Sequence, residues 1–67
     1  MPTIYVHAFE GRTLEQKRNM VREVTEAVVR TLSVPADSVT IQIVECSRDA
    51  MSRGGVLYSE MVAKPAT

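Results

Sequence analysis

Residues 2–17, PTIYVHAFEGRTLEQK, predict a strand, a turn and the start of a helix in one short stretch. Residues 3–9 are rich in β-branched and aromatic types, which favour a strand. Glu10-Gly11-Arg12 then interrupts the pattern as a turn. Thr13 and Gln16 have the spacing of a capping box, in which each side chain satisfies a free backbone N–H of the other residue. We therefore expect a helix to begin at this point.

The predicted strand has two different faces, because successive side chains of a strand point to opposite sides. One set of alternate positions is aliphatic throughout: Ile4, Val6 and Ala8. The other set mixes polar and aromatic types: Thr3, Tyr5, His7 and Phe9. Since both sets contain apolar side chains, we expect both faces of this strand to be covered.

The helix and a second strand follow in order along the chain. Apolar side chains recur from residue 14 to residue 32 at spacings of three, four and seven, which is the helical pattern. Ser33-Val34-Pro35 ends the helix, since proline disfavours the helical conformation of the residue before it. Residues 39–45, VTIQIVE, alternate again as a strand. A strand, a crossover helix and a strand predict two parallel strands with a right-handed connection.

The C-terminal third predicts only small elements. Residues 46–53 read as a loop, Gly54-Gly55 as a tight turn, and residues 56–62 as a short strand or hairpin arm, before a frayed end at 63–67. The predicted fold class is therefore α/β (α+β). It consists of one short β-α-β unit plus a C-terminal hairpin, forming a single domain over residues 1–67.

The size of the chain predicts an oligomer. A domain of 67 residues is marginally stable alone and usually needs disulfides, a metal or partner subunits. Cys46 is the only cysteine, which excludes an internal disulfide. His7 and Cys46 have no companions at ligand spacing, so no metal site is expected. We expect dimers that join two sheets side by side, with larger assemblies covering the remaining apolar surface.

Charge and hydropathy exclude several partners and locations. Eight basic and eight acidic residues give a formal net charge of zero, which argues against nucleic acid as a partner. No apolar run is long enough to span a bilayer, and the N-terminus lacks the layout of a signal peptide. The unpaired cysteine fits a reducing compartment. We therefore expect a cytoplasmic protein with no membrane partner.

Pro2 is the first candidate for chemistry. If Met1 is removed, Pro2 becomes a chain terminus with a secondary amine, held by the strand that follows. A free α-amine ordinarily has a pKa near ~8, and burial or a nearby cation lowers that pKa. Such an amine serves as a general base and then as an acid. Arg12 is a plausible cation, and its planar guanidinium suits a carboxylate. His7 and Cys46 are more simply explained as a strand histidine and a small filler.

The order and spacing of these motifs resemble the 4-oxalocrotonate tautomerase family. The resemblance covers nearly the whole chain. It is carried by Pro2, by EGRTLEQK at 10–17, by REVTEAVVRTL at 22–32, by PADSV at 35–39, and by Gly54-Gly55.

The resemblance implies a fold, an assembly and a reaction. The fold is a β-α-β tautomerase unit, assembled as a homo-hexamer (a trimer of dimers) with each site at a subunit boundary. Pro2 is the general base that moves a proton along an unsaturated 2-oxo acid, and Arg12 binds the carboxylate of this small-molecule substrate. The reaction needs no cofactor.

Two positions depart from the family pattern. Thr40 stands where the family has an arginine, and Met51 stands where it has an aromatic wall, which Phe9 could replace. Threonine offers a hydroxyl without charge, so we expect weaker polarisation of the substrate carbonyl. Three explanations stay open: Arg48 or Arg53 compensates, the substrate differs, or a partner chain in a hetero-oligomer supplies the arginine.

Two alternative functions remain at the level of sequence. One is hydration or dehalogenation of a small unsaturated acid, which needs a water-activating carboxylate and has three candidates: Glu10, Glu45 and Asp49. The other is a catalytically impaired subunit or binding module that keeps the fold, which the threonine at position 40 supports and which retention of Met1 would also favour.

Overall fold

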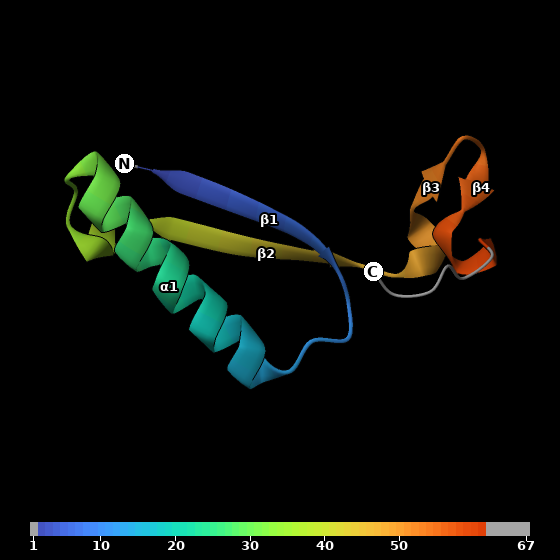
Figure 1. Ribbon diagram of the computed structural model, residues 1–67, viewed down its shortest axis with the longest axis horizontal. Coiled ribbons are helices and arrows are strands. Elements are labelled where there is room, and N and C mark those ends of the chain that lie inside the picture. The colour runs from blue at the N-terminus through green and yellow to red at the C-terminus, as the bar shows by residue number, and fades with distance from the viewer. Residues whose placement is uncertain (1, 62–67) are drawn as a thin grey trace.

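A computed structural model of the chain describes residues 2–61 (Figure 1). Its helix and strands are β1 (Thr3–Phe9), α1 (Leu14–Leu32), β2 (Thr40–Cys46), β3 (Ser52–Arg53) and β4 (Val56–Leu57). Three short 3-10 turns complete the described chain: η1 (Ala36–Ser38) between α1 and β2, η2 (Arg48–Ala50) between β2 and β3, and η3 (Tyr58–Glu60) after β4. The helix lies against one side of the β1–β2 pair, and the β3–β4 hairpin stands beyond the ends of these strands (Figure 1).

The two long strands are parallel, as the sequence predicts. Their register runs from Thr3 opposite Thr40 to Phe9 opposite Cys46. Backbone hydrogen bonds extend the pairing at both ends. The Thr40 N–H donates to the Pro2 carbonyl at 3.0 Å, and the Glu10 N–H donates to the Cys46 carbonyl at 3.0 Å. The predicted strand–helix–strand unit is confirmed. The hydrogen bond from Thr40 holds the backbone of Pro2 at the start of β2.

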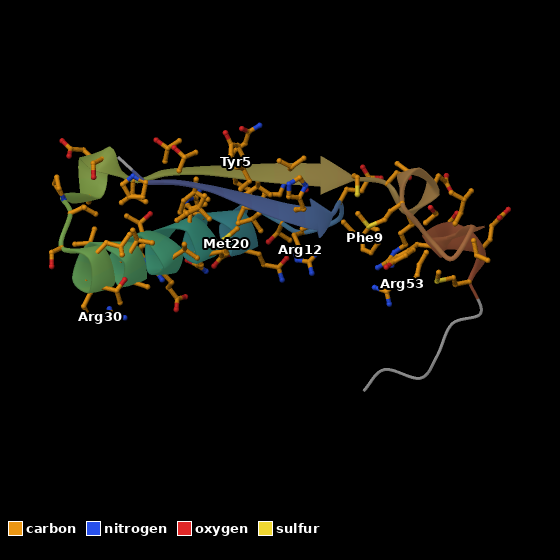
Figure 2. The ribbon with its side chains drawn as sticks, turned by 90° about the horizontal axis from the view of Figure 1, so that it is seen from above. Tyr5, Phe9, Arg12, Met20, Arg30 and Arg53 are labelled. Carbon is orange, nitrogen blue, oxygen red and sulfur yellow. The ribbon has the colours of Figure 1, made fainter. Side chains whose placement is uncertain are left out.

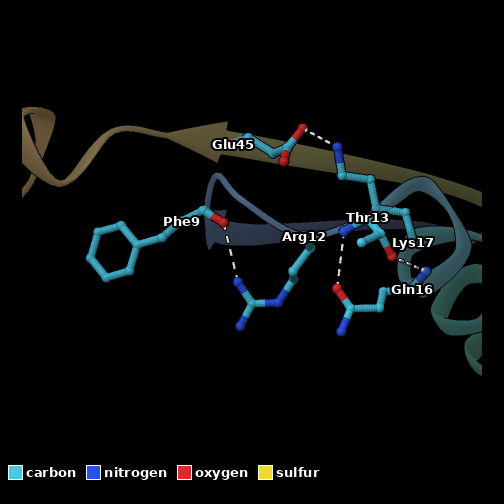
Figure 3. Close-up of polar contacts among 6 residues, drawn as sticks. All are labelled: Phe9, Arg12, Thr13, Gln16, Lys17 and Glu45. Carbon is cyan, nitrogen blue, oxygen red and sulfur yellow. Dashed lines mark hydrogen bonds and ion pairs between the residues drawn. The ribbon is translucent and has the colours of Figure 1, made fainter.

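The helix begins with the predicted capping box (Figure 3). The Gln16 N–H donates to the Thr13 hydroxyl at 3.1 Å, and the Thr13 N–H donates to the Gln16 side-chain oxygen at 3.0 Å. Both donors would otherwise lack a partner in the helix. The turn after β1 is thereby fixed in its direction into α1.

Replacing Thr13 with alanine is expected to lower the free energy of unfolding by about 1 kcal/mol, because the helix loses its N-terminal cap. Urea unfolding at one fixed protein concentration measures the change. Thr13→Ser is the matched control, since serine keeps the hydroxyl acceptor and is expected to remain near the parent value. An alanine variant as stable as the serine variant would contradict this reading of the cap.

Helix α1 ends in a left-handed residue, which the sequence does not predict. Ser33 adopts a left-handed conformation with φ of 56°, and its N–H donates to the Val29 carbonyl at 3.0 Å. The helix does stop before Val34, as proline at position 35 predicts. A left-handed residue after the last turn is a common helix end, usually occupied by glycine. The left-handed conformation is less favourable for serine than for glycine, and at Ser33 it turns the chain toward β2.

The boundaries after α1 differ from the predictions. The second strand begins one residue later than predicted and includes Cys46. The segment 46–53 is not a continuous loop, because it contains the η2 turn and the first strand of the hairpin. The strand predicted at 56–62 is only two residues long and is followed by the η3 turn. Position 62 and the predicted frayed end at 63–67 lie outside the described residues.

The single chain has no finished core. None of residues 2–61 is fully buried, and Tyr5, Leu14 and Leu32 are 60%, 70% and 59% exposed. Tyr5 lies on the sheet face opposite α1 (Figure 2), so only one face of β1 is covered within the chain. The Cα radius of gyration is 15.4 Å. A compact domain of this length has a radius of about 11 Å. Other chains are therefore needed to bury this surface.

Helix α1 is amphipathic. Among the residues that the structure describes, no helix combines the length and apolar character needed to cross a bilayer.

Candidate functional site

The predicted site residues fall into two groups at opposite ends of the sheet. Pro2 and Thr40 lie together where the strands begin. Phe9, Arg12 and Met51 lie where the strands end. The seven residues of β1 separate the groups. At about 3.3 Å per residue, Pro2 and Phe9 are about 23 Å apart. Arg12 therefore does not lie beside Pro2 of the same chain.

The first group is built on the paired starts of β1 and β2. Pro2 is half-buried and directly precedes β1, and its carbonyl accepts the 3.0 Å hydrogen bond from Thr40. Thr40 is exposed and lies opposite Thr3 in the register. Its hydroxyl is a hydrogen-bond donor without a charge. The sheet thus fixes the backbone of Pro2, while Met1 lies outside the described residues.

The second group begins with Arg12 in the turn between β1 and α1 (Figure 3). Its Nη1 donates to the Phe9 carbonyl at 3.2 Å, which holds the exposed guanidinium at the end of β1. Arg12 also lines a cavity of about 290 Å³ between α1 and the sheet. The other lining residues are mostly apolar: Val6, Ala8, Gln16, Lys17, Met20 and Ile43. An apolar cavity with a cation at its edge suits a small organic acid.

The hairpin adds aromatic and basic side chains to this end. The Arg48 guanidinium carbon lies 4.2 Å from the centre of the Phe9 ring, and that ring lies 5.2 Å from the Tyr58 ring. Arg53 lies over the other ring at 5.8 Å. Met51 is 38% exposed, and its carbonyl accepts a 2.8 Å hydrogen bond from the Tyr58 N–H. Sequence analysis missed Tyr58, since only the docking of the hairpin brings it here.

The carboxylates proposed for water activation do not form one group. Glu45 makes a 2.7 Å ion pair with Lys17 on the face of the sheet that carries α1 (Figure 3). Glu10 and Asp49 are exposed, and the Asp49 N–H donates to the Ser47 hydroxyl at 2.9 Å. None of these three carboxylates is placed beside Pro2 by a contact that the structure shows.

Among residues 2–61, the structure shows no side-chain partner for His7 or Cys46 that indicates chemistry. His7 is exposed and lies opposite Val44 in the strand register, while Cys46 is a half-buried free thiol. Within residues 2–61, no group of three or more His, Cys, Asp and Glu side chains is positioned to hold a metal ion.

Comparison with known proteins identifies the family. A family model described as tautomerase enzyme matches residues 2–61. The chain belongs to the tautomerase family. A relative of this tautomerase is a 2-hydroxymuconate tautomerase of Pseudomonas putida, 41% identical over 61 residues, which are 91% of this chain and 97% of the relative. The resemblance seen in the sequence is therefore confirmed.

Solved structures confirm both the fold and the class of enzyme. A 4-oxalocrotonate tautomerase isozyme from Methylibium petroleiphilum is 48% identical, with a TM-score of 0.82 over 87% of this chain and 91% of that chain. A heterohexamer 4-oxalocrotonate tautomerase from Chloroflexus aurantiacus is 27% identical, with a TM-score of 0.84 over 92% of this tautomerase and 100% of that chain. The predicted tautomerase unit and the predicted isomerase class are both confirmed.

Proposed function

We propose that this tautomerase interconverts the enol and keto forms of unsaturated 2-oxo acids. Pro2 is the base once Met1 is removed, and Arg12 is the carboxylate anchor. The family assignment over residues 2–61 supports the reaction class. The position of Pro2, tied by its carbonyl to the start of β2, supports a rigidly held terminal amine. A base must be held within hydrogen-bond reach of the proton that it takes.

The proposed reaction is a proton transfer without a net change in the atoms of the substrate. Starting from the enol, the neutral Pro2 amine takes the hydroxyl proton, and the electron pair of that O–H bond stays on oxygen as an enolate or dienolate. The same nitrogen, now protonated, returns the proton to a carbon of the conjugated chain, which gives the keto form; in the reverse direction it takes a proton from the carbon next to the carbonyl. Positive charge and fixed hydrogen-bond donors stabilise the dienolate oxygen without reorganising during the step. The residues present supply this chemistry without a cofactor.

The separation of Pro2 from Arg12 is the observation on which the proposed site depends. Because β1 keeps them at opposite ends, a working site takes Pro2 from one subunit and Arg12 from another. Two sheets joined antiparallel through their free edges place the start of one strand beside the end of its partner. A two-fold interface of this kind forms two equivalent sites at once. The same pairing adds Met51 and Phe9 of the partner subunit as apolar walls.

We further propose that these dimers form a homo-hexamer. The exposed Tyr5, Leu14 and Leu32 of the single chain supply apolar surface for such contacts. The heterohexamer from Chloroflexus aurantiacus supports six as the number of chains and keeps a mixed assembly as the second possibility. Native mass spectrometry measures the number directly. The lone free thiol of Cys46 supports the cytoplasmic location that we propose for the assembly.

An ultraviolet assay tests the proposed reaction. Protein whose intact mass shows that Met1 is removed is incubated with phenylenolpyruvate and with 2-hydroxymuconate. We expect both enols to convert to their keto forms well above the rate in buffer. Conversion at the buffer rate for both compounds would contradict the proposed function. In that case the impaired subunit or binding module, which Thr40 supports, would become the better account.

A further inference from the structure

Phe9 holds two guanidinium groups at the end of the sheet. Its backbone carbonyl accepts the 3.2 Å hydrogen bond from Arg12, and its ring lies 4.2 Å from the guanidinium carbon of Arg48. The ring of Tyr58, in the η3 turn, packs against the ring of Phe9. The Arg53 guanidinium lies over the Tyr58 ring. Figure 2 shows Phe9 and Arg53 at the hairpin end of the molecule, with Arg12 on the same side of the strands. Two arginines thus lie over aromatic rings, and a third, Arg12, is hydrogen-bonded to the backbone of Phe9.

Within residues 2–61, no acidic side chain lies within 4.0 Å of these three guanidinium groups as an ion pair. The two ion pairs found at 4.0 Å or less in that range join Lys17 to Glu45 and Arg22 to Glu23. Asp49, which adjoins Arg48 in the chain, is not paired with it. Positive charge that is collected without a carboxylate partner attracts anions from solution. The arrangement therefore favours an anionic ligand at this end of the sheet.

Stacking leaves Arg48 able to bind a carboxylate. The cation–π contact uses the flat face of the guanidinium, whereas its N–H donors point outward in the plane of the group. An arginine held in this way loses less conformational freedom when it forms two parallel hydrogen bonds with a carboxylate. The ring of Phe9 therefore orients Arg48 while leaving its hydrogen-bonding edge free.

Arg48 is better placed for this role than Arg53. It lies 4.2 Å from its ring, compared with 5.8 Å for Arg53, and its ring belongs to the residue that also holds Arg12. Arg48 is also the first residue of the η2 turn, whose start is fixed by the hydrogen bond from the Asp49 N–H to the Ser47 hydroxyl.

We propose that Arg48, positioned by Phe9, is a second carboxylate-binding residue of the tautomerase site. It makes the site select enol acids with two carboxylates over those with one. This proposal rests on the proposed function, in which Arg12 binds the first carboxylate.

Steady-state kinetics with two substrates test the role of Arg48. For Arg48→Gln we expect kcat/KM for 2-hydroxymuconate, which has two carboxylates, to fall by about 10–100-fold through KM, as for loss of a charged hydrogen bond. For phenylenolpyruvate, which has one carboxylate, we expect a change below about threefold. Arg22→Gln, on α1 and away from the end of the sheet, is the matched control and is expected to change neither value by more than about threefold, while Arg48→Lys recovers part of the loss by keeping the charge. Equal losses on both substrates would overturn the proposal.

A double-mutant cycle tests whether Phe9 acts through Arg48. Phe9→Leu removes the ring but keeps the backbone carbonyl and an apolar side chain. We expect it to lower kcat/KM for 2-hydroxymuconate. In the Phe9→Leu/Arg48→Gln double variant the two losses are expected to be non-additive, as for residues in contact. Strictly additive losses would overturn the positioning role of Phe9.

Binding of an unreactive dicarboxylate separates this proposal from the proposed function. Isothermal titration calorimetry with muconate needs no catalysis. We expect Arg48→Gln to weaken muconate binding by about tenfold or more and Arg22→Gln to leave it near the parent value. This result would stand even if the enol assay failed. Unchanged muconate binding in Arg48→Gln, or no binding by the parent protein, would overturn the proposal, with circular dichroism and native mass confirming that the variants are folded and assembled.

Discussion

Replacing Pro2 with alanine is expected to lower kcat/KM for 2-hydroxymuconate by about 10²–10⁴-fold, the usual contribution of a general base. Alanine still presents a terminal amine after removal of Met1. That amine is primary, and it lacks the ring that fixes the backbone before β1. The nitrogen is then less well oriented toward the proton that it must take. The ultraviolet assay of enol-to-keto conversion measures the loss.

The matched control for Pro2→Ala is Thr3→Ala. Thr3 is the exposed first residue of β1, so its substitution perturbs the same strand end without touching the terminal amine. We expect the control to keep kcat/KM within about threefold of the parent, as for most exposed substitutions. Intact mass must show that Met1 is absent from the parent and from both variants. A Pro2→Ala protein as active as the Thr3→Ala protein would contradict a proline-based mechanism.

Replacing Arg12 with glutamine is expected to raise KM for 2-hydroxymuconate by about 10–100-fold, because a hydrogen bond to a charged group is worth about 1.5–3 kcal/mol. Glutamine keeps a planar polar end but loses the charge and the bidentate geometry. Since the anchor acts on a carboxylate that does not react, we expect KM to change more than kcat. Initial rates over a range of substrate concentrations separate the two constants.

Arg22→Gln is the matched control for Arg12→Gln. Arg22 lies on α1 with its side chain 60% exposed and only a 3.9 Å contact to Glu23. The Arg22→Gln substitution removes the same charge from the protein without changing the end of the sheet. We therefore expect kcat and KM to be unchanged. If both variants showed the same rise in KM, the effect would come from net charge and not from a carboxylate anchor. A fall in kcat alone for Arg12→Gln would also contradict the anchor role.

Local patterns in the sequence predict most of the β-α-β unit. The alternation in residues 3–9 appears as half-buried Ile4, Val6 and Ala8 on the helix side of β1, and Thr13 with Gln16 forms the predicted capping box. These features depend on neighbours within four residues. The left-handed Ser33 has no such local signal, because serine adopts this conformation only where the chain must turn. The two-residue strands of the hairpin are too short to show an alternating pattern.

The candidate site is harder to predict, because it depends on contacts between distant segments. The chemistry of Pro2 and Arg12 follows from residue type and position. The sequence analysis nevertheless treats Arg12 as a neighbour of Pro2, whereas the strand between them keeps the two apart in one chain. The Arg48–Phe9–Tyr58 group is also invisible in the sequence. It forms only when the hairpin folds back and the Tyr58 N–H bonds to the Met51 carbonyl.

Mixing two impaired variants, assayed at a 2-hydroxymuconate concentration well below KM, tests the central claim most directly, namely that each site takes Pro2 and Arg12 from different subunits. Pro2→Ala and Arg12→Gln chains are co-expressed in equal amounts, and native mass spectrometry confirms mixed assemblies. Random pairing in a symmetric oligomer then gives an intact combination at about a quarter of the sites. We predict that activity on 2-hydroxymuconate recovers to about a quarter of the parent value. Mixed assemblies no more active than the two separate variants would contradict a site shared between subunits.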